Sequence, residues 1–304
     1  MKKYIYRIAT PFAKFIGKYP KLVISLIYFR YFHRCINLKN PVFFHDKIIW
    51  MSLYSDTTQW SKLADKYAVR NYVKKTVGDN ILTKLYGVYD SPDDIEFDKL
   101  PNQFVLKTNN GCTSNIIVRD KSSLDIEEAK SKLRYWMQLP YGELSGQPHY
   151  AKISPKKIIA EEYLVQPESP ENSLIDYKFN CFDGVPVSCA AFSERKEGTH
   201  SVSRMLYDME WNAHPEWYDD SKEFERKELP RPVNYNEMKE IAKKLSAGFP
   251  YVRVDLYSIG KMVIFGELTF IPGADAFYST EYQRVLGDMI QLPEKLVIKK
   301  QSEF

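Results

Sequence analysis

The sequence lacks several patterns that define common functional classes. Its four cysteines stand far apart in 304 residues and form no CxxC pair, so a reduced cytosolic chain is expected rather than a disulfide scaffold. The five histidines and four cysteines never gather at ligand spacing, which argues against zinc. There is no GxxxxGK[ST] phosphate loop, no Asp-x-Asp and no Ser/His/Asp arrangement. These absences argue against P-loop and serine-hydrolase chemistry.

Acidic residues are missing from residues 1–45, which carry nine Lys or Arg. The rest of the chain has a net charge of −5, although the whole chain has +4. We therefore treat residues 1–45 as a basic extension that is separate from a mildly acidic body. Because a nucleic-acid-binding protein would need a basic body, no nucleic-acid partner is expected.

The basic extension also lacks an apolar run that is long enough to cross a bilayer. LVISLIYF at 22–29 has eight residues, whereas a span needs about twenty. Lys14, Lys18 and Lys21 interrupt the apolar positions, so a cleaved signal peptide is not expected. Two interpretations stay open: an amphipathic segment within 1–35 that rests on an anionic membrane face, or helices packed on the body with a solvated basic face.

The body mixes helices and strands irregularly and shows no internal repeat. Helices are expected over 60–78, 124–138 and 235–249, strands over 102–107, 116–120 and 157–164, and loops over 108–115 and 140–157. A hairpin is expected to turn at Asp183-Gly184. These elements predict an α+β protein with a helical extension (1–45) and three lobes (46–100, 101–165 and 166–304).

Three positions in the body have the residue types of a nucleotide site. Lys107 ends an apolar strand and opens the loop TNNGCTSN, whose N–H groups and hydroxyls would suit phosphate oxygens. Glu161 and Glu162 end a strand, where backbone groups would suit adenine and a carboxylate would suit a ribose hydroxyl. Lys178 shares a strand face with Asp176, as an ion pair or as half of an anion site. An ordinary solvated charge remains the alternative at each position.

The stretch RVDLYSIGKMVIFGELTFIPGA, 253–274, predicts an apolar hairpin with one carboxylate in each strand. A two-residue turn at Ile259-Gly260 would put Asp255 and Glu267 on opposite faces. A three-residue loop over 259–261 would put Arg253 opposite Glu267 and Asp255 diagonal to it on the same face. Two converging carboxylates can share a divalent cation, so a metal site requires an odd loop or a bulge. An ordinary amphipathic sheet is the alternative.

The motifs taken together resemble one known family. DKYAVRNYV, FVLKTNNG, EEYL, DYKF, RVDLY and GELTF occur in the order of the TupA-like (teichuronopeptide biosynthesis) ATP-grasp family, over roughly residues 40–290. The resemblance implies an ATP-grasp fold that holds ATP between two α+β lobes. It makes 46–100 the N-terminal lobe, 101–165 the nucleotide-clamping lobe and 166–304 the lobe with the metal site.

The resemblance also implies roles for matched residues. The implied nucleotide-binding residues are Lys66, Lys107, Asn109, Asn110, Gly111, Ser114, Glu161, Glu162, Tyr163 and Leu164. The implied Mg²⁺ ligands are Asp255, Glu267 and Thr269, where Thr269 replaces the asparagine of many ATP-grasp enzymes. The candidates to bind an acceptor carboxylate or the γ-phosphate are Lys178, Arg195, Arg204 and Arg253. Solvated loop charges are the alternative for Arg195 and Arg204.

The implied reaction is the ATP- and Mg²⁺-dependent joining of a carboxylate to an amine through an acyl phosphate. The family points to an amino acid and a uronic acid, or another carboxylate, of a bacterial surface polysaccharide. The expected place is the cytoplasm, with peripheral attachment to the inner membrane face through residues 1–35. The alternatives are a glycosyltransferase or an ATP-dependent sugar phosphotransferase of the same pathway, and a non-catalytic membrane-bound scaffold.

Overall fold

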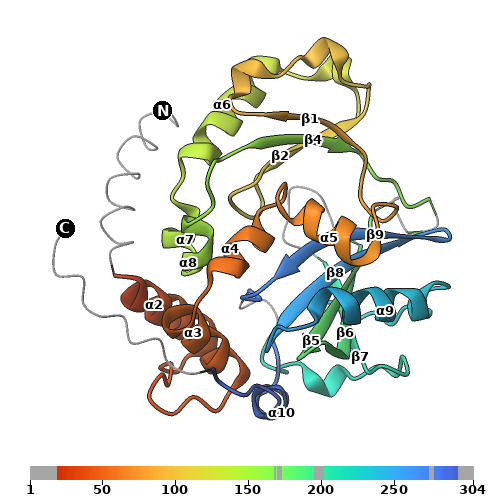
Figure 1. Ribbon diagram of the computed structural model, residues 1–304. Coiled ribbons are helices and arrows are strands. Elements are labelled where there is room, and N and C mark those ends of the chain that lie inside the picture. The colour runs from red at the N-terminus through yellow and green to blue at the C-terminus, as the bar shows by residue number, and fades with distance from the viewer. Residues whose placement is uncertain (1–18, 168, 170–172, 195–201, 274–276, 294–304) are drawn as a thin grey trace.

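The computed structural model describes residues 19–167, 169, 173–194, 202–273 and 277–293. It contains helices and two antiparallel sheets, which confirms the predicted α+β class (Figure 1). The helices are α2 (Pro20–Phe32), α3 (Phe44–Tyr54), α4 (Thr58–Ala64), α5 (Val69–Val77), α6 (Ile126–Gln138), α7 (Tyr141–Leu144), α8 (Pro148–Ala151), α9 (Tyr235–Ser246) and α10 (Thr280–Asp288). Half of the predicted membrane segment, residues 1–18, lies outside the described residues.

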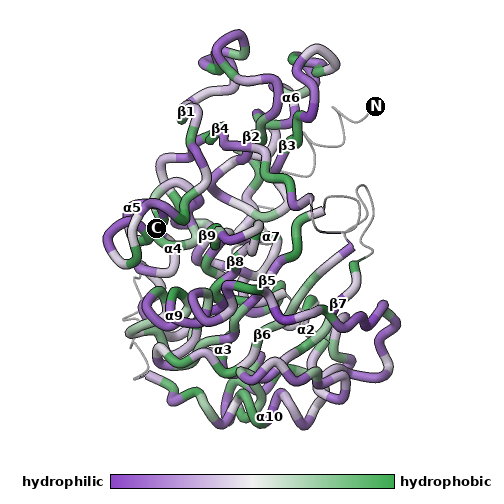
Figure 2. The backbone as a smooth tube through the Cα atoms, turned by 90° about the vertical axis from the view of Figure 1, so that its right-hand side faces the viewer, coloured by the Kyte–Doolittle hydropathy of each residue, from purple (hydrophilic) through white to green (hydrophobic). Residues whose placement is uncertain are grey.

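The smaller sheet has the strand order β1-β4-β2-β3. Its strands are β1 (Leu85–Tyr89), β2 (Phe104–Thr108), β3 (Asn115–Val118) and β4 (Ile158–Glu162). Phe104, Leu106, Ile158 and Ala160 alternate inward and meet Leu133 of α6 in one hydrophobic cluster. This period-two pattern buries one face of the sheet under α6. Figure 2 shows this sheet at one end of the molecule and α10 at the other.

The larger sheet has the order β7-β6-β5-β8-β9. Its strands are β5 (Asp176–Phe182), β6 (Val185–Ser193), β7 (Ser203–Tyr207), β8 (Val252–Ile259) and β9 (Met262–Thr269). Met238, Ala242 and Leu245 give α9 an apolar stripe at helical spacing, and this stripe packs on one face of the sheet. Side chains of α3, α4 and α5 join the same hydrophobic cluster. The opposite face carries the polar side chains Asp176, Lys178 and Asn180 of β5. At its end, Phe182 packs against Phe44 of α3.

The predicted turn at Asp183-Gly184 is confirmed. Phe182 pairs with Val185, and the two residues between them have φ of 47° and 81°. A two-residue turn with two positive φ values matches the twist of the flanking strands, and this favours the Asp-Gly pair.

Three sequence expectations are wrong in detail. The single helix over 60–78 is two helices, because the Asp65 carboxylate accepts the N–H groups of Tyr67 and Ala68 and replaces helical hydrogen bonds there. The expected loop at 140–157 contains α7 and α8, whose single turns are too short to show periodicity. The polar loop expected around Arg195 and Arg204 ends earlier, because Ser203 and Arg204 begin β7, whose five residues are all buried.

The extension contributes α2, which packs through Ile24 and Tyr28 on Ile49 of α3. Pro20 begins this helix and His33 ends it in the left-handed conformation with a φ of 51°. Within the described part of the chain, no helix is both long enough and apolar enough to cross a bilayer.

Candidate functional site

The two hairpin carboxylates are paired directly across β8 and β9. Ile259 faces Met262, so the turn has the two residues Gly260 and Lys261, and an odd loop is not the geometry that aligns the two acids. The register then shifts between Leu256 and Asp255, which leaves Gly266 as an extra residue and places Asp255 opposite Glu267. This bulge is the other geometry that puts both acids on one face.

Both acids lie in a row of polar residues, mostly buried, on the face of the larger sheet opposite α9. Lys178 of β5 pairs with Asp255 of β8, which pairs with Glu267 of β9. The next row, two residues away on β5, runs from Asp176 through Phe192 of β6 to Arg204 of β7. Antiparallel partners and alternate residues share a face. The sheet therefore presents a charged surface opposite the face that α9 covers.

Asp255 is the most constrained member of this surface. Only 2% of its surface is exposed. Arg253 grips both carboxylate oxygens at 2.7 Å, and Lys178 Nζ lies 2.6 Å from Oδ2. Burial alone would raise the pKa of Asp255, but the positive charges of Arg253 and Lys178 outweigh it and lower the pKa. Asp255 is therefore an anion at neutral pH.

Lys178 is held as a cation by the same balance. Burial opposes its charged form, but the carboxylates of Asp176 and Asp255 raise its pKa above the usual value. Its Nζ lies 3.8 Å from Asp176 Oδ1. This longer ion pair, together with the hydrogen bond to Asp255, fixes the geometry of the buried ammonium group as well as its ionisation.

Glu267 forms the open side of the site, with 38% of its side chain exposed. The Thr269 hydroxyl donates to Glu267 Oε1 over 3.2 Å and accepts from Arg253 over 3.1 Å. Arg253 Nη2 also lies 3.6 Å from Glu267 Oε1. Glu267 thus reaches solvent while its Oε1 contacts Thr269 and Arg253.

The donor set of this surface fits Mg²⁺. The ion prefers oxygen ligands, usually one or two carboxylates together with phosphate oxygens and water. Asp255 and Glu267 supply the carboxylates, and carboxylate oxygens keep further lone pairs beyond the bonds described. No cluster of three His, Cys, Asp or Glu side chains at metal-binding distance occurs among the described residues. The remaining positions would fall to the Thr269 hydroxyl, water and phosphate.

Lys107 of β2 pairs with Glu161, which the sequence predicts to contact the nucleotide. Its Nζ lies 2.9 Å from Glu161 Oε2, and Arg70 of α5 lies 2.9 Å from Glu161 Oε1. The Glu161 carboxylate is buried and shared between two cations, so a contact with a ribose hydroxyl is open only to the exposed Glu162. Sequence reasoning missed Arg70, although it lies within the motif DKYAVRNYV.

Tyr163 and Leu164 follow β4 directly. The Tyr163 hydroxyl accepts a hydrogen bond from Arg119 Nε over 3.0 Å. Both residues are partly exposed.

The loop after Lys107 is fastened at several points. Asn109 donates to Asp65 Oδ2 over 2.8 Å and accepts the Lys157 N–H over 2.8 Å, so its side chain supports the loop and does not point to a ligand. Lys66, predicted to bind phosphate, donates instead to the Gly111 carbonyl. These contacts anchor the loop to the segment between α4 and α5.

The other predicted loop residues are also enclosed. Ser114 accepts a hydrogen bond from the Thr108 hydroxyl over 2.8 Å. Asn110 is almost fully buried, and its Oδ1 has no hydrogen-bond partner in the structure. A cavity of about 130 Å³ lies against this loop, lined by Asn110, Gly111 and Ser114 together with Tyr141.

Helices α7 and α8 connect this loop to the acidic row. Tyr141 packs over Gly111, where a Cβ would lie 3.1 Å from the ring. Tyr150 and Cys112 lie 3.3 Å apart, hydroxyl to sulfur. Burial raises the pKa of Tyr141, and the neighbouring Cys112 and Glu267 add to the rise. His149 of α8 packs against Phe270, which directly follows β9, so β9 and the loop approach the same pair of helices.

His149 of α8 lies in the same region and is neutral. Burial lowers its pKa to about 3, and its ring packs against Trp60 and Phe270. A neutral buried imidazole contributes packing here and no charge.

Arg204 and Lys178 flank one aromatic ring. The Arg204 guanidinium carbon lies 4.9 Å from the centroid of Phe192, and Lys178 Nζ lies 5.3 Å from it. Arg204 also lies over Phe224 and Phe277 at 5.3 and 5.1 Å. Its expected place in a polar loop is wrong, because it belongs to β7. The other predicted loop cation, Arg195, lies outside the described residues.

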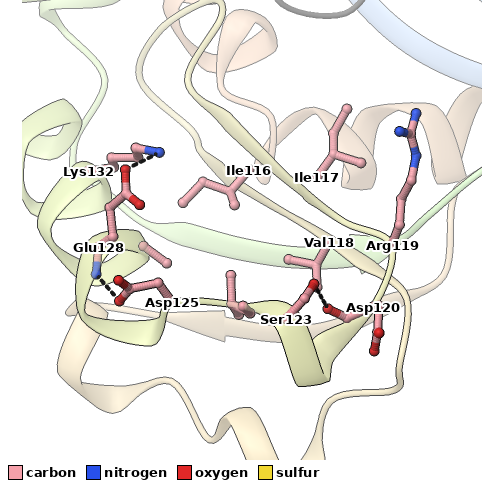
Figure 3. Close-up of a pocket in the computed structure, with 11 residues that line it drawn as sticks. Ile116, Ile117, Val118, Arg119, Asp120, Ser123, Asp125, Glu128 and Lys132 are labelled. Atoms are coloured by element: carbon pink, nitrogen blue, oxygen red, sulfur yellow. Dashed lines mark hydrogen bonds and ion pairs between the residues drawn. The ribbon is translucent and has the colours of Figure 1, made fainter.

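A groove of about 370 Å³ lies elsewhere, between the edge strand β3 and the start of α6 (Figure 3). Within it, Glu128 pairs with Lys132 at 2.8 Å, and the Ser123 hydroxyl donates to the Asp120 carbonyl. Its lining is Ile116, Ile117, Val118, Arg119, Asp120, Ser123, Leu124, Asp125, Glu128, Ala129 and Lys132. The groove therefore shares no residue with the predicted site.

Comparisons with known proteins identify one matching family and several similar structures. The family model described as TupA-like ATPgrasp matches residues 46–291. None of the curated proteins matches the chain.

Several solved structures are similar to the chain at low sequence identity. A D-alanine–D-alanine ligase from Bacillus anthracis in complex with ATP has 15% identity and a TM-score of 0.47, covering 77% of this chain and 66% of that one. The D-alanine–D-alanine ligase from Helicobacter pylori has 12% identity and a TM-score of 0.44, covering 83% of this chain and 69% of that one. The VanG D-Ala:D-Ser ligase from Enterococcus faecalis has 11% identity and a TM-score of 0.43, covering 77% of this chain and 61% of that one. The chain thus spans about two thirds of the length of these proteins.

Proposed function

Because the chain belongs to the TupA-like ATP-grasp family, we propose that it is an ATP-dependent carboxylate–amine ligase that works through an acyl phosphate. The family match covers every motif behind the resemblance and confirms both the family and its ATP-grasp fold. ATP and Mg²⁺ are the cofactors that belong to this proposal.

The row Lys178–Asp255–Glu267 is the observation that carries the proposal. Phosphoryl transfer requires little covalent chemistry from a protein and depends on positioning and charge neutralisation. The row combines two carboxylates for a cation with the basic groups Lys178 and Arg253. Lys107 supplies a further positive charge at the opposite sheet, where Glu161 holds it in place.

The chemistry divides among the residues of the chain. Lys107 and the loop 108–115 would bind the nucleotide phosphates. Lys178 and Arg204, on either side of Phe192, would orient the substrate carboxylate through charge-assisted hydrogen bonds. Asp255 and Glu267 would hold Mg²⁺, which neutralises charge on the transferring phosphoryl group when it is bound.

The reaction proceeds in two steps. A carboxylate oxygen forms a bond to the γ-phosphorus, and the bond to the bridging oxygen breaks to release ADP. The amine nitrogen then attacks the acyl carbon, the bond from that carbon to the phosphate oxygen breaks, and inorganic phosphate leaves. The amine loses one proton to solvent as the amide forms. Helices α7 and α8 cover the loop and would limit hydrolysis of the acyl phosphate.

The substrate class follows from the family setting. We assign the carboxylate to a uronic acid, or another acid, of a bacterial surface polysaccharide and the amine to an amino acid. Lys178 and Arg204 support the carboxylate part, since both are cations on one sheet face. The reaction would take place in the cytoplasm, at the inner face of the membrane.

The decisive experiment measures ADP release from Mg-ATP with the full chain against a panel of uronic acids and amino acids. Products are identified by mass spectrometry. Hydroxylamine in place of the amine should trap the acyl phosphate as a hydroxamate. An amide product and a hydroxamate that both require ATP would support the ligase.

Three results would overturn it. A product that gains one phosphoryl group and gives no hydroxamate would identify a sugar phosphotransferase. Sugar transfer from a nucleotide-sugar without ADP release would identify a glycosyltransferase. A chain that binds neither Mg-ATP nor Mg-ADP would match the non-catalytic scaffold.

A further inference from the structure

Helix α2 has an apolar face that the body does not cover. Leu22, Leu26 and Phe29 are 57%, 62% and 54% exposed. At 3.6 residues per turn they fall within about 60° of arc, so they form one stripe along the helix. The opposite side, with Ile24 and Tyr28, already packs on α3. A helix that is apolar on both faces is normally buried on both.

The charged side chains that α2 itself carries are of one sign. Arg30 is exposed and lies one turn from Leu26, and Lys21 is exposed on the same helix. Residues 1–45 contain no acid, and the first acid of the chain, Asp46, is buried and paired with Arg34. Apolar side chains beside Lys and Arg are typical of helices that lie in the interface of an anionic bilayer.

The length of α2 determines the mode of contact. Its 13 residues give a helix of about 20 Å, too short to cross a hydrocarbon core of about 30 Å. The helix can therefore only lie parallel to a membrane surface. Long basic side chains at its ends would reach the lipid headgroups while the stripe enters the acyl boundary.

We propose that the stripe Leu22–Leu26–Phe29 docks the protein on an anionic lipid surface. The proposal deepens the proposed function, since it rests on a polysaccharide acceptor at the membrane. The occupant is the lipid surface and not a second copy of the chain, because two segments with nine positive and no negative charges would repel each other.

The same helix contacts the cover of the nucleotide loop. Gly146, directly after α7, has a φ of +67°, and a Cβ there would lie 2.9 Å from Ile24 of α2. Tyr141 at the start of α7 packs over Gly111 of the loop. The packed side of α2 and the loop are therefore joined through one short helix, so a protein docked through the other side of α2 would hold its site close to the membrane.

Vesicle flotation of the full chain tests the docking. Vesicles with phosphatidylglycerol and vesicles of phosphatidylcholine alone are compared without nucleotide. We expect binding to the anionic vesicles that weakens with salt. The double variant L26D/F29D should lower the partition coefficient at least about tenfold, because two apolar side chains no longer enter the bilayer. V233D, at a residue that is 85% exposed on another part of the surface, is the matched control.

Three outcomes would overturn the proposal: no flotation of the wild type, equal flotation of L26D/F29D, or a dimer in sedimentation that L26D/F29D abolishes. Circular dichroism of both variants shows whether they remain folded. The assay contains no ATP, so a failure of docking is distinct from a failure of the ligase proposal. ADP release with soluble substrates should be unchanged in L26D/F29D.

Discussion

At the residue scale, the two carboxylates of the hairpin differ in what surrounds them. Asp255 is buried and shared between Arg253 and Lys178, whereas Glu267 reaches solvent. The buried acid therefore organises the charges around it, and the exposed acid offers its oxygens to a cation. The two residues should respond differently to loss of charge.

Glu267→Gln should remove metal-dependent ADP release without unfolding the protein. The substitution keeps the shape of the side chain and removes the charge that a divalent cation needs. We expect ADP release at fixed Mg²⁺ to fall about 100-fold or more. Substituting residues that only support metal ligands already lowers metal affinity or activity about 10- to 100-fold. Steady-state ADP release across a Mg²⁺ titration measures the loss.

Glu240→Gln, at an exposed position of α9, is the matched control and should keep full activity. Normal activity of Glu267→Gln would remove Glu267 from the site. A large drop in unfolding temperature would instead show that Glu267 has a structural role.

Asp255→Asn should lower the free energy of unfolding by about 3–5 kcal/mol. Removing one partner of a buried ion pair leaves Arg253 and Lys178 buried without their counter-charge. Urea denaturation followed by circular dichroism measures the change. Glu267→Gln, on the neighbouring strand, is the comparison and should change it by less than about 1 kcal/mol. Equal stability of the two variants would contradict this division.

The same residue should shape stability in acid. The folded pKa of Asp255 lies below its unfolded value, so its pairing stabilises the fold above the unfolded pKa. That contribution is lost as the pH falls through the unfolded pKa, about 3.9, toward the folded pKa. The wild type should therefore lose more stability than Asp255→Asn between about pH 6 and pH 3. Thermal unfolding at each pH measures the effect. If the unfolding temperatures of the wild type and Asp255→Asn fall equally with pH, the pairing is absent.

At the element scale, the bulge in the β8–β9 hairpin sets the site. Gly266→Ala would place a Cβ 3.0 Å from the Asp255 carbonyl oxygen and 3.2 Å from the Tyr257 ring. The strands must separate there, which moves Glu267 away from Asp255. We expect about a tenfold rise in the Mg²⁺ concentration for half-maximal activity, as for other losses of support in metal sites.

Gly260→Ala in the turn of the same hairpin is the control. Its Cβ would meet nothing within 4 Å, and its φ of +55° costs only the left-handed strain of about 1–2 kcal/mol. It should lower stability slightly and leave the Mg²⁺ dependence unchanged. A matching Mg²⁺ shift in both variants would mean that the bulge has no special role.

The sequence predicts elements better than it predicts their contacts. Alternation in FVLK and in RVDLY is a local property, so it shows strands β2 and β8 and the face that carries Asp255. The bulge at Gly266 is set by tertiary pairing, and no local pattern distinguishes it from an odd loop. The same holds for Glu161, whose partner Arg70 lies 91 residues away. Residue types thus indicated a site, and only the fold assigned their partners.

At the scale of the whole molecule, two hydrophobic clusters lie on either side of the candidate site. One is formed by the smaller sheet and α6, and the other by the larger sheet with α3, α4, α5 and α9. Polar contacts such as Arg70–Glu161 and Lys66–Gly111 join the first cluster to the helices of the second. A ligand that contacts both sheets would add to these few contacts and make the two parts move together.

Mg-ADP should therefore protect both sheets from hydrogen exchange, although each has its own core. Binding at 100 times the dissociation constant stabilises the bound state by about 2.7 kcal/mol, which suppresses opening of the loop 108–115 and of β9 about 100-fold. Helix α10 lies at the end of the molecule opposite the smaller sheet (Figure 2) and is the internal reference. Mass spectrometry of deuterated peptides measures the effect, with EDTA and Glu267→Gln removing it at β9. Protection of the loop alone would show that the nucleotide binds the smaller sheet without engaging Asp255 and Glu267, and would separate the nucleotide site from the metal site.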